Sequence, residues 1–530
     1  MALLIQRTLE ILIEKLSEIS LLPLGLTVLL TYFLWNLSSS KNKRLPPGPF
    51  QFPVLGSVFI FKDFVDSVRR HPLKISLPKI YGKLISFRIG GTTVIWINDL
   101  DTIKEAFITK GDVLSDRVPP DNPTFMSVGG ELAKYSGLGI GETNYGQEYK
   151  ERKHLTLQCM KEFGGLGLSL EELVSAEAQI LVAALRLEVE IRGKETDIHQ
   201  RIIHLAVSNV ICSVAFGNRY EYDDPSFLAA VNGIRFLFSG QQGRVISRIP
   251  FAKYYPSVRR LLEREVSEIS AFMNFVDEQI RLREKSYDPA EEPASFVDLY
   301  LQKCADISEE NETETIGVSN VKKIIMDLFS AGTDTTSTAL LWFLLLMIRY
   351  PEVQCKCREE IEGLGESFTN ATLSRDSITK RLPFTTASLL EAQRIGSVAG
   401  ASVPHLAKVD TSLSGYFIPK GALVTANIRF VHFDESYWQN PHEFDPSRWL
   451  KEDAGGDKWK VIQHSHFIPF SVGKRRCLGE NLAKTEYLVF GVSLLQNFKF
   501  CSVGEEPPSL EGRGLLHAPH PFKMFLEPCS

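Results

Sequence analysis

Paired cysteines, nucleotide-binding glycine motifs and long basic runs are all missing from this sequence. The net charge is only −5 and basic residues form no long run, which argues against a nucleic-acid-binding protein. The 8 cysteines are scattered singly without a C-x-x-C pair, so we expect no disulfide framework and a reducing compartment. No G-x-G-x-x-G motif follows a predicted strand, so we expect no flavin or NAD domain within the chain.

What the sequence does contain is enough apolar material for one large domain. Hydrophobic residues make up 44% of the 530 positions, with 33 Phe among them, and no linker or repeat divides the chain after residue 50. Strands are predicted over 82–89 and 92–97, with a Gly-Gly turn between them. Apolar residues that recur every three or four positions predict helices. These helices cover 149–160, 170–187, 202–216, 227–238, 261–280, 321–350 and 480–495.

The N-terminal region predicts a membrane anchor. No charged residue occurs between Ile19 and Ser40, and a window of about 20 apolar residues is long enough to cross a bilayer. Basic residues follow directly, so the positive-inside rule places the rest of the chain in the cytosol. We therefore divide the chain into an N-terminal segment, amphipathic or disordered (1–20), a transmembrane helix (21–40), a basic, proline-rich hinge (41–50) and a catalytic domain (51–530). A cleaved signal peptide is the alternative.

The most distinctive stretch is F-S-V-G-K-R-R-C-L-G, which begins at Phe470 and sets Cys477 between two glycines. A thiolate ligand needs its charge stabilised, and nearby cations, backbone N–H groups and the start of a following helix supply that. Gly473 and Gly479 allow the backbone to turn and approach a flat ring, Phe470 shields the sulfur, and Arg475 reaches a haem propionate. The stretch predicts that Cys477 is an axial haem ligand. A buried structural cysteine beside a solvated basic turn is the alternative.

These residues resemble the haem-binding loop of the cytochrome P-450 superfamily, F-x-x-G-x-R-x-C-x-G. The resemblance extends from about residue 45 to the end and is closest to animal microsomal, family 2-like members. It implies a mainly α fold with a small β-rich subdomain. In that fold haem b lies between a long oxygen-binding helix and the cysteine loop.

The predicted helix over 321–350 contains the second motif, Ala331-Gly332-Thr333-Asp334-Thr335-Thr336. It is similar to the family's [AG]-G-x-[DE]-T-T pattern. A glycine inside a helix and a threonine that bonds back to an earlier carbonyl bend the helix, which would open a groove for dioxygen. The resemblance gives Asp334 and Thr335 the catalytic role, a proton relay to oxygen.

Two further groups of residues follow from the resemblance. Glu391 and Arg394, with Arg448 further along the chain, would form a buried structural cluster that holds the cysteine loop. His405 matches a propionate contact of microsomal members, with a structural surface histidine as the alternative. The family's usual Trp and Arg are replaced by Tyr149 and Lys153, which keep one hydrogen bond and one charge but lose the bidentate guanidinium. A solvated basic helix face is the alternative for these two.

The resemblance implies that one oxygen atom from O2 enters a lipophilic substrate, a steroid, fatty acid or xenobiotic. Electrons would come from NADPH through NADPH-cytochrome P-450 reductase, or from cytochrome b5, at the endoplasmic reticulum membrane. A basic docking face for that partner is predicted at Lys150, Arg152, Lys153, Lys474 and Arg476. Pocket-lining loops are implied near 118–138, 230–251, 324–335, 396–404 and 513–520. A reductase-independent haem-thiolate isomerase or dehydratase and a haem sensor without turnover are the competing functions.

Overall fold

The computed structural model describes most of the chain after residue 44. The described residues are 44–51, 56–57, 77–89, 91–118, 137–163, 169–193, 195–196, 198–239, 255–288, 290–310, 317–365, 373–452, 459–514 and 516–529, together with Thr27, Leu30 and Thr31. Residues 1–20 and most of the predicted anchor lie outside this set. So do most of the pocket loops predicted near 118–138 and 230–251, of which 118, 137–138 and 230–239 are described. Within the anchor, Thr27, Leu30 and Thr31 are helical and exposed, and the Thr31 hydroxyl donates to the Thr27 carbonyl at 2.6 Å.

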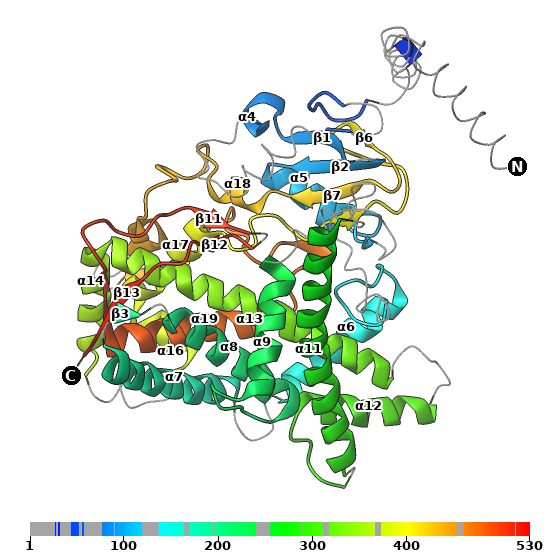
Figure 1. Ribbon diagram of the computed structural model, residues 1–530. Coiled ribbons are helices and arrows are strands. Elements are labelled where there is room, and N and C mark those ends of the chain that lie inside the picture. The colour runs from blue at the N-terminus through cyan, green and yellow to red at the C-terminus, as the bar shows by residue number, and fades with distance from the viewer. Residues whose placement is uncertain are drawn as a thin grey trace, which may run out of the picture.

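Helices form the body of the protein, as Figure 1 shows. The longer ones are α6 (Gln147–Phe163), α7 (Leu170–Arg192), α8 (Ile198–Phe216), α9 (Pro225–Ser239), α11 (Pro256–Ser286), α12 (Phe296–Glu310), α13 (Val318–Arg349), α14 (Pro351–Glu362), α17 (Pro383–Gly396) and α19 (Glu480–Asn497). The shorter ones are α4 (Leu77–Tyr81), α5 (Leu100–Lys104), α16 (Arg375–Arg381) and α18 (Ile428–His432). Every helix predicted from apolar periodicity is present, most of them a few residues longer than the pattern that predicts them.

Helix α13 crosses the middle of this body, in contact with α8, α17 and α19 (Figure 1). It is apolar on all sides from Ala339 to Ile348, where all ten side chains are buried. A helix of that composition lies in a protein core or a membrane. Among the described residues, the segment long and apolar enough to span a bilayer is Ser319–Arg349, and 78% of its apolar 18-residue window is buried inside the protein. It is therefore the central core helix.

A four-stranded sheet lies against one end of the helical body. Its order is β1 (Leu84–Ile89), β2 (Thr92–Ile97), β7 (Leu423–Ala426) and β4 (His405–Leu406). Strands β1 and β2 form an antiparallel hairpin, β2 and β7 are parallel, and β4 and β7 are antiparallel. This sheet and the helical body confirm the mainly α fold with a small β-rich subdomain.

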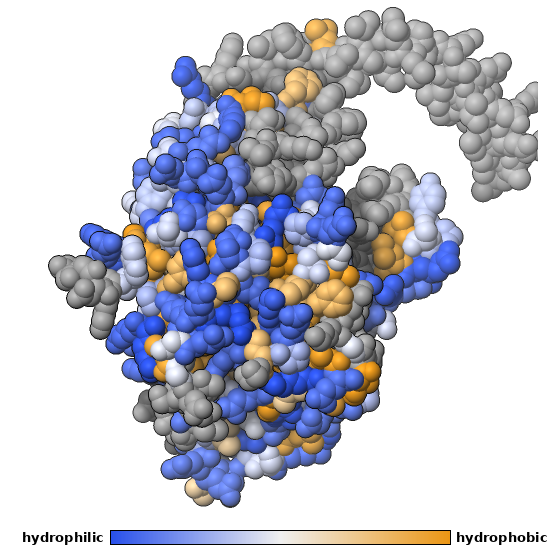
Figure 2. Space-filling view, turned by 90° about the vertical axis from the view of Figure 1, so that its left-hand side faces the viewer, coloured by the Kyte–Doolittle hydropathy of each residue, from blue (hydrophilic) through white to orange (hydrophobic). Residues whose placement is uncertain are grey.

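The remaining strands form smaller sheets. They are β10 (Phe498–Ser502) with β13 (Met524–Pro528) and β3 (Glu195–Thr196), β5 (Thr411–Leu413) with β6 (Tyr416–Ile418), β8 (Leu450–Glu452) with β9 (Trp459–Val461), and β11 (Gly512–Arg513) with β12 (Ala518–Pro519). Figure 2 shows one outer face, where hydrophilic residues predominate and hydrophobic ones occur in small groups.

The hinge predicted over 41–50 is attached to this sheet where it is described. The Ser86 hydroxyl donates to the Pro46 carbonyl at 2.5 Å, and the Ser86 N–H donates to the Pro47 carbonyl at 2.9 Å. A Cβ on Gly48 would lie 1.7 Å from the Ser86 carbonyl oxygen, so only glycine allows this approach. The proline-rich segment is thus fixed to β1 and is not a free spacer.

Candidate active site

The cysteine loop occupies the turn between β9 and α19. A 3-10 turn, η6 (Gly473–Arg475), precedes Cys477, whose N–H donates to the Phe470 carbonyl at 3.0 Å. Gly473 has φ +84°, and a Cβ there would lie 2.0 Å from the Phe107 carbonyl oxygen, so the loop requires glycine at this position. Gly479 has φ −83°, and no protein atom lies within 4 Å of a Cβ placed on it. Its close approach to a flat ring therefore stays a prediction.

Cys477 is exposed, yet burial raises the pKa of its thiol, and the backbone N–H of Gly479 opposes that rise. The exposure of Cys477 and the rise in its pKa by burial agree if the side chain faces a recess inside the protein. Helix α19 begins at Glu480, so its positive N-terminal end lies beside the sulfur. The Arg476 guanidinium donates to the Glu480 carboxylate at 2.6 and 2.7 Å. Its positive charge therefore acts on this carboxylate as well as on the Cys477 thiol.

Basic side chains gather near the loop. The Arg475 guanidinium donates to the carbonyls of Ser115 and Ile140 at 2.9 and 3.1 Å, and its central carbon lies 3.8 Å from the Tyr149 ring centre. Arg117, which sequence reasoning missed, donates to the Pro404 carbonyl at 3.0 Å.

The surroundings of these basic side chains disfavour their charged forms and lower their pKa values. Burial and the charge of Arg475 lower the pKa of Arg117 to about 9. Burial and Arg117 lower the pKa of His405 well below its usual value, and its Nδ1 lies 2.6 Å from the Leu114 carbonyl. Burial likewise lowers the pKa of Arg475, with Asp116 among the neighbours that oppose it. Two half-buried guanidiniums, of which Arg475 lowers the pKa of Arg117, favour an anionic ligand beside them.

Tyr149 and Lys153 converge on the cysteine loop. The Tyr149 hydroxyl and the Lys153 ammonium donate to the Lys474 carbonyl, at 3.2 and 3.1 Å. Tyr149 is 3% exposed. The pair therefore ties α6 to the loop that carries the cysteine, and its propionate contact stays a prediction.

The predicted docking face loses one member. Arg152 is only 4% exposed, donates to the Gly137 carbonyl and pairs with Glu148. It anchors the loop before α6 and is not available to a partner. Lys150 is exposed, and Lys474 is partly exposed with Asp112 at 3.8 Å.

On α13, Thr335 bonds back to the helix as expected: its hydroxyl donates to the Ala331 carbonyl at 2.6 Å. Ala331 is exposed and Thr335 is half-buried. The turns of α13 before and after them carry buried core residues. Gly332 also lets α8 approach, because a Cβ there would lie 2.7 Å from Ile211 Cδ1. The groove for dioxygen stays a prediction.

The second member of the expected relay, Asp334, faces α8. Its Oδ1 lies 3.3 Å from Nε2 of His204, and their side chains are 14% and 6% exposed. Sequence reasoning did not single out His204, because a lone histidine in an amphipathic helix carries no pattern.

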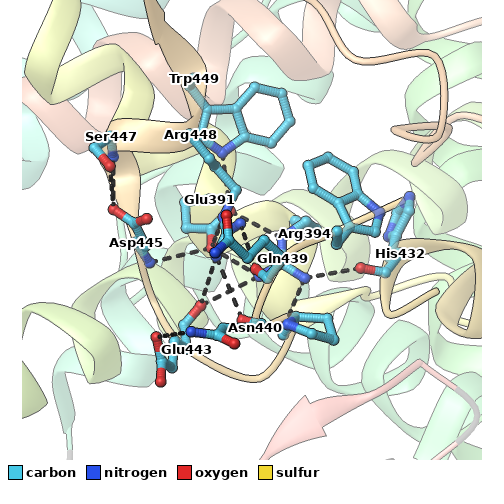
Figure 3. A network of polar contacts seen from close by, with 12 residues as sticks. Glu391, Arg394, His432, Gln439, Asn440, Glu443, Asp445, Ser447, Arg448 and Trp449 are labelled. Carbon is cyan, nitrogen blue, oxygen red and sulfur yellow. Dashed lines mark hydrogen bonds and ion pairs between the residues drawn. The ribbon is translucent and has the colours of Figure 1, made fainter. Parts of the chain in front are cut away.

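The structural cluster is brought together by three separate segments (Figure 3). Glu391, completely buried, accepts from Arg394 at 2.7 and 2.9 Å, from Arg448 at 2.9 Å and from the Trp449 indole at 2.9 Å. The Asp445 N–H adds a contact at 3.2 Å. The carboxylate therefore has five donors, which is the condition for a stable buried charge.

His432 connects this cluster to the cysteine loop. Its carbonyl accepts from Arg394 at 2.8 Å, its Nδ1 lies 2.8 Å from the Ser397 hydroxyl, and its Nε2 accepts the Ile468 N–H at 3.1 Å. Ile468 lies two residues before Phe470, where the loop begins. Sequence reasoning missed His432, because the contacts that define its position span distant segments.

These positions fit a haem. Cys477 presents an accessible sulfur, Ala331 and Thr335 present an accessible strip on the core helix, and the basic cluster offers partners for two carboxylates. An accessible cysteine beside several basic groups is the donor set that a haem-thiolate site requires.

The comparisons with known proteins assign the family. The model of the family "Cytochrome P450" matches residues 46–526. Cytochrome P450 2J2 of Homo sapiens is 34% identical over 93% of this chain and 93% of its own length. Cytochrome P450 2U1 and cytochrome P450 2D3 of Rattus norvegicus are 33% and 31% identical, over 95% and 96% of this chain and 94% and 99% of their own lengths. The chain belongs to the cytochrome P450 family, with family 2 members as relatives, and is a haem-thiolate monooxygenase.

Proposed function

We propose that this chain is a monooxygenase of the endoplasmic reticulum membrane that binds haem b through Cys477 and faces the cytosol. It inserts one oxygen atom from O2 into a lipophilic substrate of the steroid, fatty-acid or xenobiotic type. Electrons come from NADPH through NADPH-cytochrome P-450 reductase, with cytochrome b5 as a second donor. The observation that carries the proposal is the cysteine loop, in which an accessible Cys477 lies at the start of α19 beside the basic cluster.

The domain organisation proposed here has four parts: 1–20, 21–40 as the membrane helix, 41–50, and 51–530 as the catalytic domain. Support for the anchor comes from its uncharged sequence and from Leu30, which is helical and 59% exposed. A helix with large apolar side chains exposed to its surroundings suits a lipid environment. The exposed members of the basic face, Lys150, Lys474 and Arg476, are the proposed docking groups for an acidic reductase.

Haem supplies the iron at which dioxygen is reduced, and the thiolate pushes electron density toward it to favour O–O cleavage. The chain's own residues hold and orient the haem. Arg117, Arg475 and His405 would bind its propionates. Tyr149 and Lys153 would contribute a further hydrogen bond and charge there, while they fix the loop through Lys474. Phe470 would shield the sulfur from water, and Asp334 and Thr335 on α13 would deliver protons.

The test of the proposed ligand is the carbon monoxide spectrum of the reduced protein. The wild type is expected to show the strongly red-shifted Soret maximum of a thiolate-ligated haem. Cys477→Ser should abolish that maximum because a hydroxyl is a poor ligand to iron. Cys501→Ser, at a half-buried cysteine in β10, is the matched control and should keep it. A red-shifted maximum in folded Cys477→Ser protein would disprove the assignment.

The proposed relay predicts a loss of coupling in Thr335→Ala. If the Thr335 hydroxyl steers protons to oxygen, its removal should raise hydrogen peroxide released per NADPH and lower product per NADPH, by about tenfold or more. Ser337→Ala is a suitable control, because Ser337 bonds back to Thr333 on the same helix at 2.7 Å and is buried. Unchanged peroxide per NADPH in Thr335→Ala would contradict the role.

A further inference from the structure

A buried pair of basic side chains lies between α18 and β12, away from the cysteine loop. Arg429, the second residue of α18, is 5% exposed, and His517, which directly precedes β12, is 1% exposed. One terminal nitrogen of the Arg429 guanidinium lies 2.9 Å from Nδ1 of His517. The contact joins two segments that are 88 positions apart in the sequence.

Both members of the pair bind the segment that follows α17. The backbone N–H of Arg429 donates to the Gly400 carbonyl at 2.9 Å, and the backbone N–H of His517 donates to the Val398 carbonyl at 2.9 Å. Both carbonyls belong to the pocket-lining loop predicted near 396–404. Figure 1 shows β11 and β12 beside α17, where this loop begins.

His517 is also fixed to the core helix α13. It belongs to a second pocket-lining loop, predicted near 513–520. Its carbonyl accepts the Trp342 indole N–H at 2.6 Å, and its ring stacks on the Trp342 ring with 5.0 Å between centres and 7° between planes. A Cβ on Gly512 would lie 2.1 Å from its Nε2, so only glycine leaves room for the ring. Arg429 therefore connects α18 to a ring that the core already holds in place.

The charge of Arg429 has no acidic partner within the described part of the chain. No carboxylate there forms an ion pair with it, and its Nε has no hydrogen-bond partner among those residues. Burial and the charge of Arg394 lower the pKa of Arg429 to about 9, so the guanidinium stays charged at neutral pH. The Phe433 ring, 5.0 Å from the guanidinium carbon, compensates in part. A buried charge without a partner of opposite sign lowers stability, so a contribution to stability does not account for Arg429.

The Nδ1 atom of His517 can serve one partner at a time. It lies 2.7 Å from the Gly396 carbonyl at the end of α17, as well as 2.9 Å from Arg429. Nδ1 donates to the carbonyl only when it carries the proton, and accepts from Arg429 only when it does not. A hydrogen bond from a charged guanidinium is the stronger of the two, so we expect Arg429 to decide which nitrogen carries the proton.

We infer that Arg429 is a specificity-determining positioning residue, which binds His517 and thereby keeps two walls of the substrate pocket close together. The inference rests on the proposed function, because these walls would face the haem that Cys477 binds. Without Arg429, Nδ1 of His517 donates to the Gly396 carbonyl instead. The protein then stays folded, while the wall that contains His517 is released from α18.

The experiment measures the dissociation constants of imidazole and 4-phenylimidazole for the haem-loaded, full-length protein, from the Soret shift on nitrogen ligation of the haem iron. Imidazole reports on the iron alone, whereas the phenyl group must fit between the pocket walls, so no substrate need be known. In Arg429→Met, the dissociation constant of 4-phenylimidazole relative to that of imidazole is expected to fall by about threefold or more, as for side chains in direct contact. An unchanged or raised ratio would overturn the inference.

Variants of the partner test whether the two side chains act together. His517→Leu removes the acceptor and should lower the ratio as Arg429→Met does, and the double variant should lower it no further. His517→Asn keeps an acceptor for Arg429 and should keep the wild-type ratio. Effects that add up in the double variant would show that the two side chains act separately, which contradicts the inference.

Thermal unfolding separates this role from a merely structural one. Arg429→Met removes a buried charge without an acidic partner, so its unfolding midpoint should equal or exceed that of the wild type. Arg283→Met is the control, because it breaks an ion pair with the buried Asp298 between α11 and α12, and should lower the midpoint without changing the ratio. A ratio that falls equally in Arg283→Met would show that it reports stability alone, and the inference would fail.

The carbon monoxide spectrum distinguishes failure of this inference from failure of the proposed function. If the reduced wild type lacks the red-shifted maximum, the proposed haem ligand is wrong. A normal maximum with an unchanged ratio in Arg429→Met refutes the role of Arg429 alone.

Discussion

Glu391→Ala is expected to express as a protein that retains no haem, with the free energy of unfolding lowered by about 3–5 kcal/mol, the cost of stranding a buried charge. The substitution leaves Arg394, itself completely buried, without its carboxylate partner and removes the acceptor of the Trp449 indole. Through Arg394 and His432 the damage reaches the segment before the cysteine loop. The measurement is haem bound per polypeptide, together with urea unfolding of the purified protein.

The control for this prediction is Glu435→Ala. Glu435 pairs with Lys79 at 3.2 Å, but both side chains are more than half exposed, at 61% and 65%. Exposed pairs contribute about 0–1 kcal/mol, so this variant should bind haem normally. Normal haem content in Glu391→Ala would show that the cluster does not support the loop.

Acidification is expected to destabilise the protein through its buried histidines. Burial and the charges of Arg394 and Arg429 lower the pKa of His432 to about 3 from 6.5. The folded state therefore binds fewer protons than the unfolded state between these two values. Stability is unaffected by His432 above pH 6.5 and falls as the pH decreases below it, by about 2 kcal/mol at pH 5. His405 and His517, whose pKa values burial also lowers well below the usual range, should add to the loss.

Urea unfolding at several values between pH 7 and pH 5 measures this effect. His432→Asn should be less stable at pH 7, because contacts to Ser397 and Ile468 are weakened. Its stability should nevertheless fall less steeply with acid, by about 1.4 kcal/mol per pH unit, the contribution of one proton. His520→Asn, at an exposed position, is the control and should keep the wild-type slope. An unchanged slope in His432→Asn would contradict the prediction.

The family's cysteine motif and the core helix could be recognised in the sequence because their patterns are local. Cys477 lies at a fixed spacing from Gly473 and Phe470, and the apolar stretch from Ala339 to Ile348 exceeds what a surface helix carries. The pairing of Glu391 with Arg394 is likewise a matter of helical spacing. The sequence did not show why a particular residue type occurs at certain positions. Gly332 accommodates Ile211, and that contact depends on how α8 packs.

Other residues of the site carried no signal of their own. Arg117, His204 and His432 are single polar residues in ordinary surroundings, and each acquires its role from a segment far away in the chain. Arg152, by contrast, carries the pattern of a surface cation and is buried, because the loop at Gly137 and Thr143 folds over it. Charge patterns along a helix do not indicate which face another segment covers.

By itself the sequence determined the class of chemistry, the mainly α fold, the central helix and the members of the buried charged cluster, because each depends on residues at short, regular spacing. The tertiary structure alone decided which cations share the site, which partner Asp334 has and how the cluster reaches the cysteine loop. These are contacts between segments separated by tens to hundreds of positions. Their energies come from burial and from charges brought together out of water, and those exist only once the chain has folded.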